Sequence, residues 1–352
     1  MTLRPLVLLA LAALACQKPG DAAGGKDTKA GTAGDPAGKA GPASAAGAGV
    51  DPTAKVTECP KSLGGSDKLH RVISKDCGVV PVTEDYYVDG GSLTLEAGSS
   101  LSFKDGAGLY VGYYEPAKLV VQGTAEAPVV LTAAGDKAPG VWRGVSINEH
   151  AARSTIAGLV IEYAGNDESA LYVAATDVSV TGSKIRESKG TGLLIADGGT
   201  LAAFTDNELK KLGSKTAIAG PASAIAGLGA GNRFDAGAHV LVRGGGVSKS
   251  GTWQPSGAPL LIGGEVNVDG DVGQPAKLEL AAGLELRFGE SGALVVGNYN
   301  PGALVVAGTA EAPVTFTAQE RREAGGWSGV RVHGKGEATI DQAVFEFGGR
   351  DE

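Results

Sequence analysis

Apolar residues recur in the middle of the chain at intervals of about two dozen residues. Ile161, Ile185, Leu209 and Phe234 follow one another at nearly equal steps. Around these positions apolar and polar residues alternate, which is the pattern of a β-strand with one buried face. Further short apolar runs follow, separated by Gly, Ser, Asn or Asp: second runs begin at Leu171, Leu193, Ala217 and Val240, and third runs at Val178, Leu201 and Ile225.

Three short strands in each period of this length predict a solenoid. One coil cannot bury its own apolar side, so the coils must stack in parallel, at about 4.8 Å per coil, around a dry core. We therefore predict an all-β fold, a parallel β-helix with three short strands per coil of about 22–25 residues. Asn207 and Asn232, two positions before the core residue of their strands, are expected to stack as a ladder.

The chain also repeats itself on a larger scale. The motif GTAEAPV begins at Gly123 and again at Gly308, and the same offset in numbering separates Trp142 from Trp327. A structural turn recurs whenever its coil does, whereas a catalytic motif need not, so the repetition indicates scaffold. We assign a first copy to residues 79–263 and a second copy, which stops early, to residues 264–352. Functional chemistry is expected where the copies differ.

The segments GTWQPSGAPLLIGGEVNV, LELAAGLELRF and GALVVAGTAEAPVTFTA of the second copy resemble a known family. They are similar to the right-handed β-helix repeat proteins, pectin-lyase-like in fold, found among bacterial secreted proteins and lipoproteins. The resemblance covers residues 79–352 and implies a right-handed helix. Because the group includes enzymes, adhesins and proteins without an assigned activity, the resemblance implies no single function.

The N-terminus has the features of an export signal. Arg4 precedes an apolar stretch, residues 6–15, that is too short to span a bilayer, which predicts a signal peptide at residues 1–15. Residues 13–16, Ala-Leu-Ala-Cys, resemble a bacterial lipobox, in which Cys16 would become the lipidated N-terminus. They also fit ordinary signal peptidase, which would leave a soluble periplasmic or secreted protein. Gln17 resembles the sorting pattern for the outer membrane.

The cysteine count favours the lipobox. An exported chain tends not to leave an odd thiol exposed, and the chain has three cysteines. A disulfide between Cys59 and Cys77 leaves Cys16 over, and lipidation gives it a use. Residues 16–55 are rich in Ala, Gly and Lys without an apolar period, which predicts a tether. Residues 56–78 predict a disulfide-stapled cap over the first coil.

Charge and motifs argue against several classes of function. The net charge is −8 and the charges are interspersed without a basic stripe, so nucleic acid is not an expected partner. The sequence contains no polygalacturonase-like carboxylate pattern and no metal-ligand spacing, so we expect no catalytic set, metal or cofactor. A calcium-dependent lyase site would need Asp167, Glu168 and Glu187 beside Arg186 as the base, and we favour a structural role for these residues.

Aromatic residues make up only 5% of the chain. Aromatic faces suit the apolar faces of sugars, which makes a few of these residues candidates for glycan contact. The candidates are Tyr113, Tyr114, Trp142 and Trp327. Both Trp residues and Tyr114 have aromatic equivalents in the other copy, and this repetition favours a packing role for them.

Together these features favour a non-catalytic cell-envelope lipoprotein. Its β-helix would serve as a scaffold or binding surface, tethered to the outer membrane by a lipid and facing a polysaccharide or an envelope protein. A polysaccharide lyase or epimerase acting on an anionic glycan is the alternative function. A surface adhesin is a third.

We predict that palmitate labels the wild-type protein and fails to label the Cys16→Ser variant, because the proposed lipid attaches through the thiol of Cys16. Metabolic labelling followed by immunoprecipitation measures this. Equal labelling of both proteins, or of neither, would contradict the lipobox.

Overall fold

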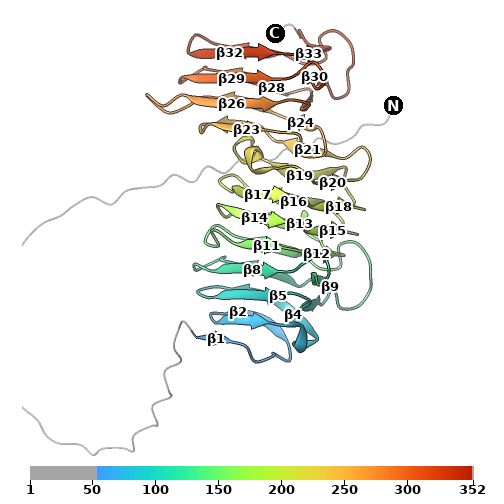
Figure 1. The fold of residues 1–352 in the computed structure, drawn as a ribbon. Helices are drawn as coiled ribbons and strands as arrows, with labels where there is room; N and C mark the ends of the chain where they lie inside the picture. The colour runs from blue at the N-terminus through green and yellow to red at the C-terminus, as the bar shows by residue number, and fades with distance from the viewer. Residues whose placement is uncertain (1–53, 351–352) are drawn as a thin grey trace, which may run out of the picture. The chain divides into compact units, whose positions relative to one another are not determined.

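A computed structural model describes residues 54–350 (Figure 1). The predicted signal peptide, Cys16 and most of the predicted tether lie outside the described residues. Within residues 54–350, no helix is long and apolar enough to cross a membrane. The described residues form a right-handed parallel β-helix, which confirms the predicted fold class.

Successive strands of the first part of the helix fall into three columns, each a stack of strands one coil apart. The first column contains β4 (Val79–Val88), β6 (Ser100–Phe103), β9 (Val129–Ala133), β12 (Leu159–Glu162), β15 (Lys184–Arg186), β18 (Glu208–Lys210) and β20 (Arg233–Phe234). The second contains β2 (Leu63–Asp67), the end of β4, β7 (Gly108–Val111), β10 (Gly144–Ile147), β13 (Ser169–Val173), β16 (Thr191–Ile195), β19 (Thr216–Gly220) and β21 (His239–Val242). The third contains β1 (Lys55–Val56), β3 (His70–Ile73), β5 (Ser92–Glu96), β8 (Lys118–Gln122), β11 (Thr155–Ala157), β14 (Val178–Thr181) and β17 (Leu201–Thr205).

Beyond β21 the columns are rearranged. The second column continues through β24 (Leu260–Ile262), β27 (Glu285–Phe288), β30 (Val314–Ala318) and β33 (Ala343–Phe345). Two four-stranded sheets complete the coils: β22 (Gly245–Val247), β25 (Glu265–Val268), β28 (Ala293–Val296) and β31 (Val330–Val332), and β23 (Gly251–Trp253), β26 (Ala276–Ala281), β29 (Gly302–Ala307) and β32 (Gly336–Asp341).

Equivalent strands of the two copies do not all stack in the same column. β27 is the equivalent of β6, because Phe288 ends the one strand as Phe103 ends the other. Yet β6 belongs to the first column and β27 to the second. The stacking of this strand therefore changes between the copies.

The core is built from rows of inward side chains that the parallel register aligns. The predicted row of Ile161, Ile185, Leu209 and Phe234 is confirmed, because each residue pairs with the next across adjacent coils. At the far end of the described residues, the last coil leaves core positions such as Phe345 about half exposed, at 49%.

Each copy contains the same stacked Trp–Phe pair in its core, which we call the aromatic joint. The Trp142 ring stacks on Phe103 with centroids 4.0 Å apart, and the Trp327 ring stacks on Phe288 at the same distance. The indole N–H of Trp142 donates to the carbonyl of Glu162, and that of Trp327 to the carbonyl of Glu346, both at 2.8 Å. The repeated contacts show that the duplication preserves packing.

The repeated GTAEAPV motif forms a turn in both copies. The amide of Gly123 donates to Ala157 of the next coil, and that of Gly308 donates to Asp341. A Cβ at Gly123 would lie 2.2 Å from a backbone oxygen, and one at Gly308 would lie 2.1 Å from another. The coils approach so closely here that only glycine fits, so the motif is scaffold.

One predicted strand is absent. The run at Ile225 is part of a 3₁₀ helix, η2 (Ala222–Gly227), and its place in the third column is taken by a single bridge between Leu228 and Phe204. Pro221 caps this helix. Proline has no N–H to donate to a strand ladder, so it favours a break at this point. Alternation alone did not reveal this break.

The predicted asparagine ladder is confirmed. The Oδ1 atom of Asn207 accepts the amide of Ser183 at 2.9 Å, and the Oδ1 atom of Asn232 accepts the amide of Asn207 at 3.0 Å. Both asparagines are buried. Their side chains satisfy backbone donors at the corner between the third and first columns, where strand pairing is interrupted.

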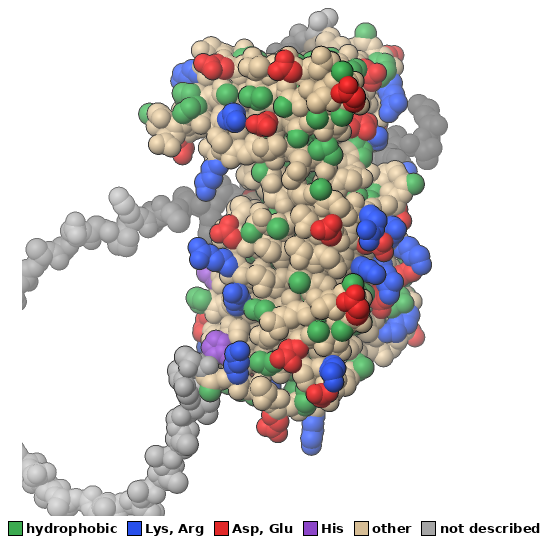
Figure 2. Space-filling view, in the orientation of Figure 1, with side chains coloured by type: hydrophobic (Ala, Val, Ile, Leu, Met, Phe, Trp, Pro, Cys, Tyr) green, Lys and Arg blue, Asp and Glu red, His purple; other side chains and the backbone are tan. Residues whose placement is uncertain are grey.

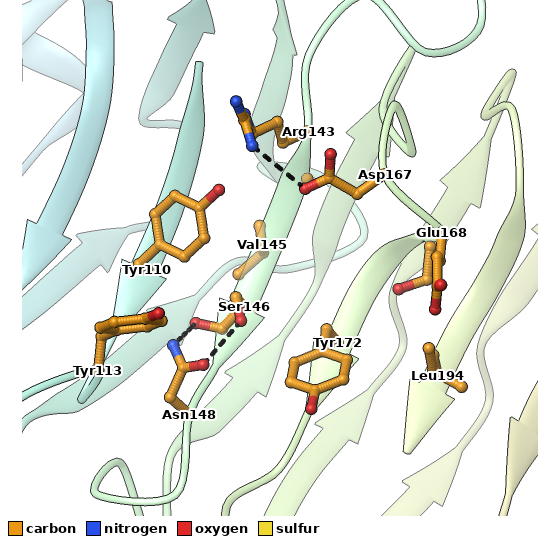
Figure 3. Close-up of a pocket in the computed structure, with 12 residues that line it drawn as sticks. Tyr110, Tyr113, Arg143, Val145, Ser146, Asn148, Asp167, Glu168, Tyr172 and Leu194 are labelled. Atoms are coloured by element: carbon orange, nitrogen blue, oxygen red, sulfur yellow. Dashed lines mark hydrogen bonds and ion pairs between the residues drawn. The ribbon is translucent and has the colours of Figure 1, made fainter. Parts of the chain in front are cut away.

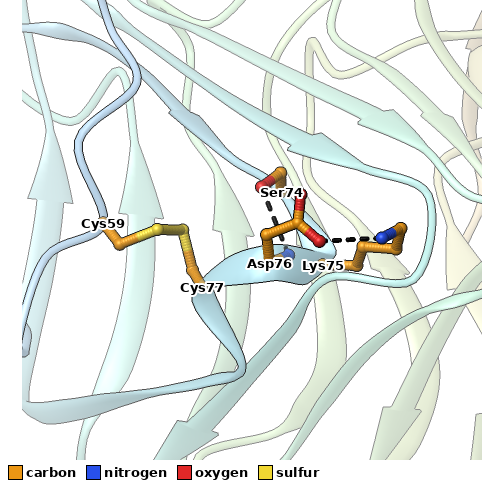
Figure 4. The surroundings of a disulfide bond; sticks show 5 residues. All are labelled: Cys59, Ser74, Lys75, Asp76 and Cys77. Carbon is orange, nitrogen blue, oxygen red and sulfur yellow. Dashed lines mark hydrogen bonds and ion pairs between the residues drawn. A yellow bond between two sulfur atoms is a disulfide. The ribbon is translucent and has the colours of Figure 1, made fainter.

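A disulfide joins Cys59 to Cys77 ahead of β4 (Figure 4). Cys77 ends the short 3₁₀ helix η1 (Lys75–Cys77). The hydroxyl of Ser74 caps this helix by accepting the amide of Asp76 at 3.3 Å. The bond ties the segment before the first column to the first coils.

Acidic and basic side chains are interspersed over the visible face, with several Lys and Arg side chains along one edge (Figure 2). On the outside of the first column such charges pair between coils: Arg186 with Glu162 at 2.6 Å, and Arg233 with Glu208 at 3.5 Å. Ion pairs this exposed contribute about 0–1 kcal/mol each, so the core and the backbone ladders hold the coils together.

We predict that Asn207→Ala lowers the free energy of unfolding by about 1–3 kcal/mol, because the buried amide of Ser183 loses its acceptor. Urea unfolding of the full chain measures the loss. Asn166→Ala, at an exposed position, is the matched control and should change stability little. Equal losses in the two variants would contradict a structural role for the ladder.

Candidate functional site

The outward side chains of the second column form a row of aromatic and small residues. Tyr87, Tyr110, Ser146, Tyr172 and Leu194 pair one with the next across five coils. Their neighbours along each strand point into the core, so the pleat sends this row to the surface. No charged residue interrupts the row.

A hollow opens where Ser146 stands between two larger side chains. Tyr110 and Tyr172 lie on either side of it, two coils apart, which is about 9.6 Å at the spacing of paired strands. Gly144 and Val145 lie beneath, and the hollow measures about 400 Å³ (Figure 3). We call this hollow the tyrosine slot.

A cluster of four tyrosine rings borders one end of the slot. The Tyr87 and Tyr110 rings stack with centroids 4.9 Å apart. Tyr113 is edge-on to both of them and to Tyr114, with centroid distances between 4.6 and 6.1 Å. Tyr113 is 48% exposed and Tyr114 is 70% exposed. The cluster therefore offers aromatic surface to a ligand.

A buried carboxylate holds the turn that carries this cluster. One oxygen of Asp89 accepts the amides of Tyr114 and Glu115, at 2.9 and 3.3 Å. Asp89 is only 2% exposed. The turn conformation, and with it the direction of Tyr113 and Tyr114, is therefore set from below by backbone hydrogen bonds.

Charged groups border one side of the slot. The Arg143 guanidinium lies 3.8 Å from Asp85 and 3.6 Å from Asp167, and its Nε donates to the carbonyl of Gly106. Glu168 lines the slot beside Asp167. Two carboxylates therefore share a single guanidinium, and a third carboxylate lines the slot.

Polar groups border the other side, near Tyr113 (Figure 3). The hydroxyl of Ser146 lies 3.1 Å from the side-chain oxygen of Asn148 and donates to it. The amide of Asn148 donates to the carbonyls of Val111 and Ser146. The Ser146 oxygen keeps lone pairs free to accept a ligand hydroxyl.

The slot shifts the pKa values of the groups around it. Burial is the main reason that the pKa of Tyr110 rises to about 12, and the charge of Asp85 adds to it. The pKa of Arg143 is also raised, by Tyr110 first and then by Asp167 and Asp85. A guanidinium with a raised pKa stays protonated at physiological pH, so Arg143 is poorly suited to act as a general base.

The structure separates the four aromatic candidates. Tyr113 lines the slot, and Tyr114 is exposed in the tyrosine cluster beside it. Trp142 and Trp327 are 0% and 1% exposed, so neither ring can reach a ligand at the surface. Their equivalence in the two copies reflects the aromatic joint of the core, which is the packing role that the repetition favoured.

The lyase constellation considered from the sequence does not form. Arg186 pairs with Glu162 and Glu187 pairs with Lys211, both at 2.6 Å and away from the slot. Asp167 and Glu168 line the slot instead. Among the described residues, no three His, Cys, Asp or Glu side chains lie together as a metal-ion site would need.

Sequence reasoning missed Tyr87, Tyr110 and Tyr172. Each stands between two core residues of an alternating strand, so the signal was an aromatic residue at an outward position. Connecting them required the register of the second column, which aligns residues at unequal separations along the chain.

Several residues of the slot differ between the copies. The turn held by an aspartate is kept. Asp269 accepts the amide of Tyr299 as Asp89 accepts that of Tyr114, and both tyrosines are 70% exposed. Gly144 and Val145 of the slot recur as Gly329 and Val330, whereas its aromatic and cationic residues are not kept. Tyr87, Tyr110, Tyr113 and Arg143 are replaced in the second copy by Asn267, Val295, Asn298 and Ser328.

Residues 79–191 match the family model of the pectate-lyase-like beta helix domain. The matched span contains the tyrosine cluster, Arg143 and Tyr172. No curated protein and no solved structure matches the chain. The matched residues are therefore those that carry the slot.

We predict an effect of Tyr110 on stability at alkaline pH. Its phenol stays protonated in the folded chain up to a pKa of about 12, whereas an unfolded tyrosine ionises near pH 10. Its contribution to stability is therefore present below about pH 10 and is lost as the pH rises towards 12. The unfolding free energy of Tyr110→Phe should fall less than that of the wild type over this range, measured by urea unfolding. Identical losses would contradict the shift.

Proposed function

We propose that this chain, which carries a pectate-lyase-like β-helix domain, is a non-catalytic glycan-binding protein of the cell envelope. The observation that carries the proposal is the tyrosine slot of the first copy, whose Tyr87, Tyr110, Tyr113 and Arg143 are replaced in the second copy. Scaffold requirements cannot explain the difference, because both copies keep the same core joint and the same turns.

The dimensions of the slot fit a sugar ring. Two van der Waals contacts across the gap would take up about 7–8 Å between Tyr110 and Tyr172 for a flat ring. The strands that carry Tyr110 and Tyr172 lie about 9.6 Å apart, which leaves room for the greater thickness of a puckered pyranose. Ser146, Asn148 and Arg143 place hydrogen-bonding groups around the rim for the hydroxyls of the sugar.

Binding is favoured over lyase or epimerase chemistry by the state of the charged groups. Proton abstraction needs a group that can accept a proton, and the pKa of Arg143 is raised rather than lowered. The described residues also do not gather the carboxylates of a calcium site. A surface adhesin would be a special case of the same binding function.

The subcellular location is proposed from the sequence. The lipobox-like residues ending at Cys16, the tether and Gln17 support a lipid-anchored protein of the outer membrane. A soluble periplasmic or secreted protein is the alternative.

We predict that the full chain binds glycans on an array and that Tyr172→Ala weakens the binding about tenfold, from loss of one aromatic wall. Ser146→Met, which fills the slot, should weaken it at least as much. Calorimetry with the best array ligand measures both variants.

Tyr114→Ala and Tyr299→Ala form a matched pair for the same assay, because both side chains are equally exposed and both turns are held by an Asp. Tyr114→Ala should weaken binding, and Tyr299→Ala should not. Equal effects, or no glycan bound at all, would refute the proposed site. New unsaturated chain ends in the incubated glycan would instead establish a lyase.

A further inference from the structure

We infer that the tyrosine slot selects a sugar ring that carries a protonated amine, such as a hexosamine unit, and discriminates against uronates. The inference rests on the proposed function, because it names the class of ligand for the same slot. It follows from the combination of aromatic walls with an excess of carboxylates.

The net charge at the slot is negative. Arg143 is the only cation among the residues that line it, and its charge is already shared by Asp85 and Asp167. Lys189, the next cation along the same corner, lies against Gly140 and does not line the slot. Glu168 also lines the slot, and the charge of Arg143 is directed to the other two carboxylates.

The pKa of Tyr110 reflects this negative charge. Asp85 and Asp167 both act to raise the pKa of Tyr110, and only Arg143 opposes them. A carboxylate brought beside Tyr110 would face the same repulsion and would also have to shed its hydration. A uronate ring is therefore disfavoured in the slot, although its shape fits.

A protonated amine meets favourable partners on two sides. The tyrosine walls can receive it over a ring face, with a gain of about tenfold in affinity for such a contact. Asp167 and Glu168 stand on the charged side of the slot and can accept its N–H donors (Figure 3). The remaining hydroxyls of the ring would meet Ser146 and Asn148 on the opposite side.

The test compares three oligosaccharides of equal length on the full chain by calorimetry: a glucosamine oligomer, its N-acetylated counterpart and a galacturonate oligomer. We expect the glucosamine oligomer to bind about tenfold more tightly than the neutral one, with galacturonate weakest. The advantage of the amine should shrink as salt is added, because the attraction is electrostatic.

Glu168→Gln, at an exposed position, should reduce the ratio of glucosamine to N-acetylglucosamine affinity severalfold. Glu311→Gln, an exposed site in the second copy, is the control and should leave that ratio unchanged. If the neutral oligomer binds as well as the amine or better, or if galacturonate binds best, the inference is overturned while glycan binding stands. If none of the three binds but other glycans bind on the array, the inference alone falls. If nothing binds in either assay, the proposed function falls with it.

Discussion

The structure depends on the parallel hydrogen-bonded register between successive coils. That register fixes the spacing of the coils and places each residue directly above its counterpart one coil earlier. Inward residues then form continuous rows such as Ile161 to Phe234, which close the core. Outward residues are aligned by the same bonds, so Tyr110, Ser146 and Tyr172 become walls and floor of one slot. The register that stacks the coils therefore also aligns the walls of the slot.

The sequence was sufficient where the rule was periodic. The spacing of the apolar rows predicted the solenoid, and the position of Asn207 and Asn232 predicted their ladder, because both depend on repetition at one coil. The sequence was insufficient where a local preference interrupts the period. After Pro221 the chain forms a 3₁₀ helix instead of the expected strand. The slot was also out of reach, because loops of unequal length separate Tyr110, Ser146 and Tyr172 and hide their alignment.

The internal duplication separates what maintains the fold from what serves the site. The paired Trp–Phe stacks, the glycine turns and the Asp-held tyrosine turns recur with nearly the same geometry. Tyr87, Tyr110, Tyr113 and Arg143 do not recur. Two copies of one architecture within a single chain thus act as an internal control: positions that the coil itself requires are kept, and positions free of that requirement have diverged. Tyr87, Tyr110 and Tyr113 belong to the second class, whereas Tyr114 recurs as Tyr299.

The divergence between the copies has a consequence for valency. β28 is the equivalent of the strand that carries Tyr110, and it has Val295 at the matching position. Among the described residues the slot is therefore built once, so a polymer of many equivalent sugar units would gain no avidity from a single chain. Cross-linking of two polymers would need a second molecule of the protein.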